Sequence, residues 1–162
     1  MITRITSYLS LILLLMVGNA FADNMVMARV PMKADLTFEH LKDAIEGHGY
    51  SVAHVQLCDG GMKEFGYKSD LYRVVFFGKI EEVSHISEDH PEFVPYVPLK
   101  MTVVAERGET LLSIVNPQTY AVYYPNDKDM QIQFARWYND ILSILSDMQK
   151  ITGEKVSMQF VN

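Results

Sequence analysis

The sequence contains almost no cysteine: Cys58 is the only one among 162 residues. An intramolecular disulfide is therefore excluded, and the fold has to be held by a hydrophobic core. Two accounts of Cys58 stay open. The sequence favours a small buried side chain at the end of a strand, and the alternative is an exposed thiol that is available to a partner.

Basic residues are also scarce. The chain has 14 Lys and Arg against 20 Asp and Glu, which gives a formal net charge of -6. A negative surface without a basic stripe argues against nucleic acid and against anionic lipid headgroups. We therefore expect no nucleic-acid partner.

Long apolar runs are absent except at the N-terminus. Residues 9–17 are almost entirely apolar, they follow Arg4, and they precede Ala20-Phe21-Ala22, a small-x-small pattern that signal peptidase cleaves. The run is shorter than the roughly 20 apolar residues that cross a bilayer. The sequence predicts a signal peptide over 1–22, cleavage after Ala22, and an exported periplasmic protein without a stable membrane span. An uncleaved inner-membrane anchor is the alternative.

The remaining residues, 23–162, have the length of one ordinary domain. Apolar patterning predicts strands over 25–30, 50–57, 71–77, 99–106 and 110–115, with 156–161 as a candidate edge strand. Residues 74–77 are apolar without interruption, which is typical of a central strand covered on both faces. The prediction is a single α+β domain whose sheet of about five strands, mixed or antiparallel, is backed by helices.

Three helices are predicted, over 37–47, 80–89 and about 129–150. Thr37 is the expected N-cap of the first. The last is long and amphipathic, with an apolar stripe made of Phe134, Trp137, Tyr138, Ile141, Leu145 and Met148. Leu142 and Ile144 widen that stripe, and we interpret the surplus as a surface for a second subunit in a homodimer.

Motifs for catalysis and metal binding are missing from the sequence. It contains no Gly-x-Ser-x-Gly, no His-x-His and no Cys-x-x-Cys. His85 and His90 are five residues apart, which places them off a common helix face. The acid pairs Glu81-Glu82 and Glu88-Asp89 are interpreted as a solvated helix face. We therefore predict no catalytic residues, no metal site and no cofactor.

Aromatic residues gather in two irregular, proline-containing segments, and Pro91, Pro95 and Pro98 are expected to keep the first of them extended. Rigid amphipathic rings of this kind suit a binding face or the rim of a pocket, or they cover the open end of a sheet; both interpretations stay open. The predicted binding residues are Phe93, Tyr96, Tyr120, Tyr123 and Tyr124.

The order and spacing of several short motifs resemble one known family. These are Ile45-x-x-x-Gly49, Tyr72-Arg73-Val74-Val75-Phe76-Phe77, His90-Pro91, Val97-Pro98, Val103-Val104-x-Glu106 and Asn116-Pro117. The chain resembles, over about residues 36–120, the bacterial family of unknown function numbered 302. The resemblance implies a compact α+β domain that is often dimeric and often exported, and it implies no activity. Many relatives carry a cysteine after the proline that matches Pro98, where this chain has Leu99, so any thiol chemistry tied to that cysteine is not implied.

Two functions are carried forward from the sequence. The leading hypothesis is a non-catalytic periplasmic binding or accessory domain that meets a small apolar ligand or an envelope protein through the aromatic residues. The alternative is a redox or metal accessory protein, related to copper or haem handling. It would use Cys58 together with His54, Met62 or the methionines near the N-terminus.

Overall fold

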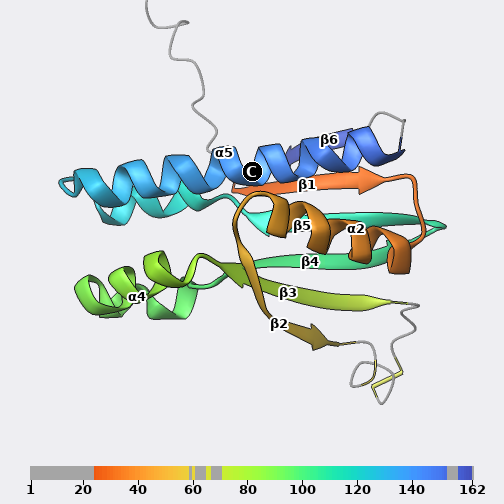
Figure 1. Cartoon of the computed structure of the whole chain (residues 1–162), viewed down its shortest axis with the longest axis horizontal. Coiled ribbons are helices and arrows are strands. Elements are labelled where there is room, and N and C mark those ends of the chain that lie inside the picture. The colour runs from red at the N-terminus through yellow and green to blue at the C-terminus, as the bar shows by residue number, and fades with distance from the viewer. Residues whose placement is uncertain (1–23, 59, 61–64, 67–70, 153–156, 162) are drawn as a thin grey trace, which may run out of the picture.

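A six-stranded sheet backed by helices makes up the protein in the computed structural model, which describes residues 24–58, 60, 65–66, 71–152 and 157–161 (Figure 1). The elements are β1 (Met25–Val30), α2 (Ala34–Gly47), β2 (Ser51–Leu57), β3 (Tyr72–Gly78), α4 (Ile80–Asp89), the 3-10 helix η1 (Pro91–Tyr96), β4 (Leu99–Glu106), β5 (Glu109–Val115), the 3-10 helix η2 (Pro117–Tyr123), α5 (Lys128–Thr152) and β6 (Ser157–Val161). The α+β class is confirmed. The sheet has one strand more than the predicted five, because the candidate edge strand forms.

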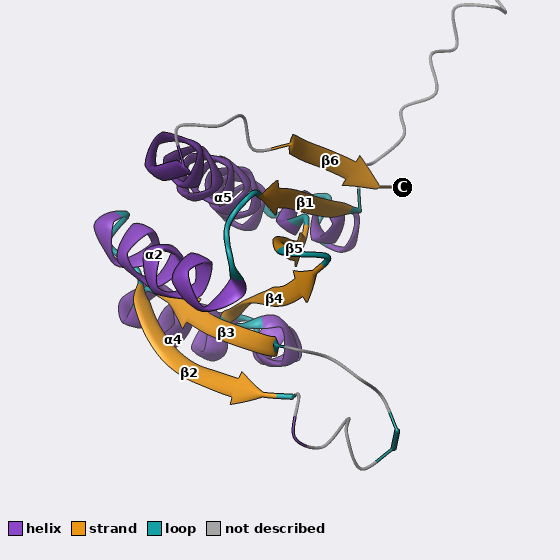
Figure 2. Cartoon of the chain, turned by 90° about the vertical axis from the view of Figure 1, so that its right-hand side faces the viewer, coloured by secondary structure: helices purple, strands orange, loops and turns teal. Residues whose placement is uncertain are grey.

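All neighbouring strands are antiparallel, in the order β2-β3-β4-β5-β1-β6. Figure 2 shows α2 and α5 on the inner side of the curved sheet. Side chains alternate between the two faces of a strand, so Val75 and Phe77 on β3 are fully buried, whereas Val74 and Phe76 are only half-buried. The prediction that this strand is covered on both faces was therefore wrong: helices cover one face.

Helix α2 begins three residues before the predicted N-cap. Lys33 is the N-cap, and Thr37 lies inside the first turn, where its hydroxyl donates to the Lys33 carbonyl at 3.1 Å. A threonine that satisfies its hydroxyl on the preceding turn has no need to end the helix. Phe38, Leu41 and Ile45 recur at helical spacing along α2, and all three are buried.

Helix α5 buries the whole predicted stripe except Tyr138, which is half-buried. Of the two residues that widen the stripe, Ile144 is fully buried and Leu142 packs at the edge of the core. Contacts within the chain therefore account for the extra apolar width. The homodimer stays a prediction, without the support that this width was expected to give.

The two irregular aromatic segments are 3-10 helices rather than extended chain. Pro91 and Pro117 each stand at the start of one, where a missing N–H costs nothing because the first turn has no partner for it. The prediction that the prolines keep 91–98 extended was wrong for η1. Gly78 allows α4, and Pro98 between η1 and β4, to lie close to the sheet, because an added Cβ there would stand 2.9 Å from Val83 and 3.3 Å from Pro98.

The predicted signal peptide, residues 1–22, lies outside the described residues. Within the described part of the chain, no helix combines the length and the apolar character that a bilayer span requires.

Candidate functional site

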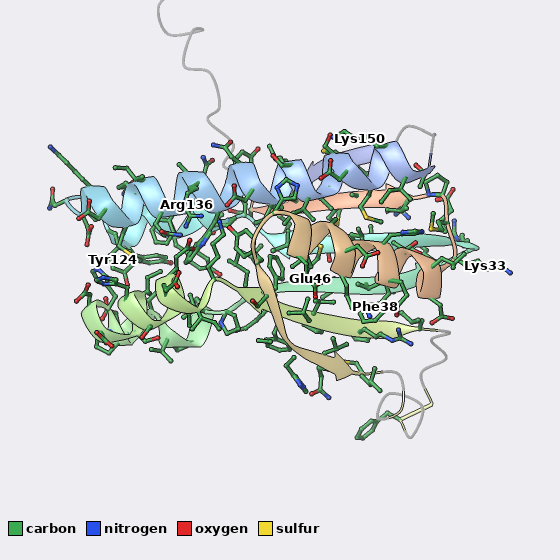
Figure 3. All side chains as sticks on the ribbon, viewed as in Figure 1. Lys33, Phe38, Glu46, Tyr124, Arg136 and Lys150 are labelled. Carbon is green, nitrogen blue, oxygen red and sulfur yellow. The ribbon has the colours of Figure 1, made fainter. Side chains whose placement is uncertain are left out.

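The five predicted aromatic residues converge at one end of the molecule. The Phe93 ring, from η1, lies 5.1 Å from the ring of Tyr96 and 5.2 Å from that of Tyr120, measured between centroids. The Tyr96 and Tyr120 rings are 4.9 Å apart, and the Tyr124 ring is 5.9 Å from Phe93. The two 3-10 helices are separated by the β4–β5 hairpin, so this cluster forms only when the sheet does. In Figure 3, Tyr124 lies between α4 and α5.

These side chains enclose a cavity of about 220 Å³. Its lining consists of Glu92, Phe93, Tyr96, Tyr120, Tyr123 and Tyr124, and we call it the aromatic pocket. Phe93 is 2% exposed, whereas Tyr96 is 48% and Tyr123 76% exposed. The inner ring therefore belongs to the core, and the outer rings form an open rim. Both interpretations of the aromatic residues describe part of the arrangement.

The base of the aromatic pocket continues into α5. Phe93 lies 5.4 Å from the Phe134 ring and stacks at 16° on Trp137 with a centroid separation of 6.4 Å. Both α5 side chains are buried. Because Trp137 is the only tryptophan of the chain, its fluorescence reports on the pocket.

One carboxylate, Glu92, stands on the rim of the pocket. It accepts a hydrogen bond from the Tyr124 hydroxyl at 2.8 Å, and His90 Nδ1 lies 3.4 Å away. Hydrogen bonds from its own backbone N–H and from Tyr124 lower the pKa of Glu92, and His90 adds to the effect. His90 also lies 3.2 Å from Asp127 and meets the Tyr124 ring edge-on.

Two tyrosines of the pocket, Tyr120 and Tyr124, have raised pKa values. Burial and the hydrogen bond to Glu92 raise the pKa of Tyr124 to about 12, and burial raises the pKa of Tyr120. The aromatic pocket therefore presents neutral ring faces beside one ionised carboxylate at neutral pH.

A second polar cluster joins α4 to α5 beneath the pocket. Glu82 Oε2 accepts from Arg136 Nη2 at 2.7 Å, from the Trp137 indole N–H at 3.2 Å and from Gln133 at 3.3 Å. Arg136 also pairs with Asp140 at 3.1 Å; Figure 3 shows it between α5 and α4. The interpretation of Glu82 as part of a solvated helix face was therefore wrong, although Glu81 and Glu88 are exposed.

Asp140 extends this cluster to the start of β2. It accepts a hydrogen bond from the Tyr50 hydroxyl at 2.6 Å, and burial and this contact raise the Tyr50 pKa. Lys79 Nζ lies 4.7 Å from the centroid of the Tyr50 ring. Glu82 and Asp140 share the guanidinium of Arg136, and this arrangement explains why α4 is fixed against α5.

Cys58 follows β2, at the end of the sheet away from α4 (Figure 1). The side chain is partly exposed, and its thiol lies 3.8 Å from the Gln56 carbonyl. His54 is four residues earlier on the same strand, which puts about 13 Å between the two Cα atoms. That spacing is too great for a shared metal ion. Met62 lies outside the described residues, and in the described part no group of three His, Cys, Asp or Glu side chains is arranged to hold a metal.

Sequence reasoning named every ring of the aromatic pocket and missed its polar partners. Glu92 carries a weak signal, since it directly precedes Phe93. His90 and Asp127 carry none, because their pairing joins residues that are 37 positions apart (127 minus 90).

Comparisons with known proteins agree with the fold. The model of a family described as a domain of unknown function, DUF302, matches residues 26–147. This match confirms the resemblance. The chain is similar to the crystal structure of an uncharacterised conserved DUF302 protein from Bacillus stearothermophilus, with a TM-score of 0.67 and 17% identity over 77% of this chain and 98% of that one. No curated protein matches the chain.

Proposed function

The chain belongs to the DUF302 family, a domain of unknown function, and we propose that it is an exported binding protein that holds a small ligand in the aromatic pocket. One observation carries the proposal. Two 3-10 helices from distant parts of the sequence bring their rings around a cavity of about 220 Å³ and leave Tyr96 and Tyr123 half to three-quarters exposed at its rim. Tyrosine rings are amphipathic, and a group of exposed rings around a hollow is typical of a binding surface.

The size and lining of the pocket define what it holds. Pockets for drug-sized molecules measure about 300–1,000 Å³, so this one suits a smaller molecule or one group of a larger one. Its walls are rings that contribute contact area at little conformational cost. Its one carboxylate is engaged by Tyr124 and His90. We therefore propose binding rather than catalysis.

The proposed place of action is the periplasm. The support is the sequence alone: the apolar run over residues 9–17 and the cleavage pattern that ends at Ala22. Cys58 has no part in this proposal, because it stands at the other end of the sheet.

Recovery of the bound molecule tests the proposal. The full chain is purified from the periplasm under native conditions, denatured, and the released small molecules are identified by mass spectrometry. We expect a molecule that accompanies the wild-type protein and is lost in the double variant Tyr96→Ala/Tyr123→Ala. Trp137 fluorescence of the emptied protein should change when the molecule is returned.

Val122→Ala is the matched control. Val122 is 72% exposed and precedes Tyr123 in η2, but it does not line the cavity. This variant should retain the molecule. If nothing is released from the wild-type protein and its Trp137 signal does not respond to a small-molecule extract of the periplasm, the proposal is wrong. Equal retention by the double variant contradicts it as well.

A further inference from the structure

We propose that the aromatic pocket selects a small organic cation, and that the group it recognises is a methylated ammonium such as trimethylammonium. This inference rests on the proposed function and names the class of ligand. It follows from three features of the lining: the number of ring faces, the position of the single carboxylate, and the absence of any lysine or arginine from the lining residues.

The ring faces supply the first attraction. The face of an aromatic ring carries negative charge from its π electrons, so a cation within about 6 Å of a ring centroid is attracted to it. Five rings line one cavity, and two of them, Tyr96 and Tyr123, are 48% and 76% exposed, so they are open to a ligand. Phenols are uncharged at neutral pH, and the pKa values of Tyr120 and Tyr124 are raised further, so the rings offer this attraction without requiring a second charge in the pocket.

The carboxylate supplies the second. Glu92 stands among the rings on the rim, and the Tyr124 hydroxyl holds it at 2.8 Å. Glutamate is ionised at neutral pH, and the pKa of Glu92 is lowered further. A methylated ammonium spreads its charge over its methyl groups, so it packs against rings and a nearby carboxylate without needing a hydrogen bond from either.

The surrounding charges favour a cation as well. Apart from His90, which faces Glu92, the basic side chains beside the pocket do not line it: Lys100 Nζ donates to the Pro95 carbonyl at 2.6 Å. Lys128 lines a neighbouring hollow with Asp127 and Asp129 rather than the aromatic pocket. The whole chain carries a net charge of -6.

Other ligand classes fit the lining less well. An anion would meet the carboxylate of Glu92 and the negative faces of the rings. A bare metal cation requires several oxygen ligands, and the pocket offers one carboxylate. A neutral apolar group would make the same ring contacts, but it would displace water from the carboxylate without compensating its charge.

A pair of isosteric probes separates charge from shape. Choline and its neutral carbon analogue 3,3-dimethylbutan-1-ol have the same outline and differ in the central atom of the head group. Each is titrated into the full-length mature protein, with Trp137 fluorescence and calorimetry as readouts. Because the rings and Glu92 attract the charge of choline and have no such attraction for the neutral analogue, we expect choline to bind about tenfold more tightly or better.

Variants assign that preference to named side chains. Tyr123→Phe keeps a ring face and should retain choline binding, whereas Tyr123→Ala should weaken it. Glu92→Gln keeps an acceptor for the Tyr124 hydroxyl and should reduce the preference for choline over its analogue without abolishing it, because the ring faces remain. Glu46→Gln is the charge-matched control: Glu46 is an exposed residue on α2 and lies away from Tyr124 (Figure 3).

A trimethylammonium group occurs in free small molecules and in phosphatidylcholine, and vesicles distinguish the two sources. Binding of choline without sedimentation on dioleoylphosphatidylcholine vesicles assigns a free ligand. Binding of choline together with sedimentation assigns the lipid headgroup, and both results support the inference.

Two results overturn it. If the neutral analogue binds as tightly as choline, the pocket recognises shape alone, and the proposed function stands without the cation. If neither probe binds while another class of molecule is recovered from the native protein, the ligand class is wrong and the proposed function again survives. Recovery of no molecule at all contradicts the proposed function itself.

Discussion

Replacing Glu82 with alanine should lower the stability of the protein against denaturant, because it removes contacts between α4 and α5. The Glu82 carboxylate is the shared acceptor for Arg136, Trp137 and Gln133, all from α5. The alanine variant leaves these three donors facing the gap where the carboxylate was. Of the three donors, the Trp137 indole N–H is the least able to bond to water instead, because its side chain is buried.

The magnitude follows from what each donor loses. A buried donor left without a partner costs about 1–3 kcal/mol. The Arg136–Glu82 ion pair adds at most about 1 kcal/mol, because both side chains keep contact with solvent and water screens the charges. Arg136 also retains Asp140 at 3.1 Å. We expect Glu82→Ala to lower the free energy of unfolding by about 2–3 kcal/mol in total.

The preceding residue gives a matched control. Glu81 is exposed, stands in the same first turn of α4, and interacts with the same helix dipole. Glu81→Ala should therefore cost less than about 1 kcal/mol, and the difference between the variants isolates the contacts with α5. Urea titrations followed by circular dichroism provide both values, provided that the transition is two-state. Equal destabilisation by the two variants would refute the role assigned to Glu82.

Three further predictions concern the pocket and the thiol. Phe93→Ala should cost about 3–5 kcal/mol in a urea titration because a buried ring is lost, whereas Tyr123→Ala, at an exposed site, should change stability by less than about 0.5 kcal/mol; a similar loss in both would contradict the division into core and rim. Absorbance at 295 nm should show Tyr124 ionising at about 12 rather than at its ordinary 10. Since the folded-state pKa is the higher one, the stability it contributes is complete below pH 10 and is lost as pH rises through about 12, and Tyr124→Phe should remove that loss. Cys58, being partly exposed, should react with a thiol reagent in the native protein, and Cys58→Ser should leave pocket binding unchanged; a loss of binding would favour the redox alternative.

Secondary structure was predictable here because periodicity is a local property. The apolar alternation of β1 and β4 and the three-to-four-residue stripe of α5 depend on neighbouring residues, and these elements appear within two residues of the predicted bounds. The start of α2, with Lys33 as its N-cap, was missed because threonine is a common N-cap residue. The identity of Thr37 does not show whether it precedes the helix or lies in its first turn. The 3-10 helices were missed because prolines are compatible with both an extended chain and a first helical turn.

The candidate site was predictable from the sequence only in part. Its rings were identified in advance because aromatic residues and prolines gather in two short irregular segments, which is a local feature of the sequence. The partners of Glu82 and His90 were not, because hydrogen bonds between α4 and α5 or between His90 and Asp127 depend on how helices dock. The surplus apolar width of α5 was misread for the same reason, since only the docked α2 and sheet show that Ile144 is covered within the chain.

The sequence by itself determined the class of fold, the absence of a disulfide, the negative charge, and the set of aromatic residues, because each depends on composition or on spacing along the chain. Only the tertiary structure decided that the aromatic rings enclose a cavity, that Glu92 is the carboxylate among them, and that Glu82 secures α4 to α5. The physical reason is the range of the interactions. Backbone propensity and burial act on neighbours in sequence, whereas a pocket is formed by side chains whose positions are fixed by the pairing of strands far apart in the chain.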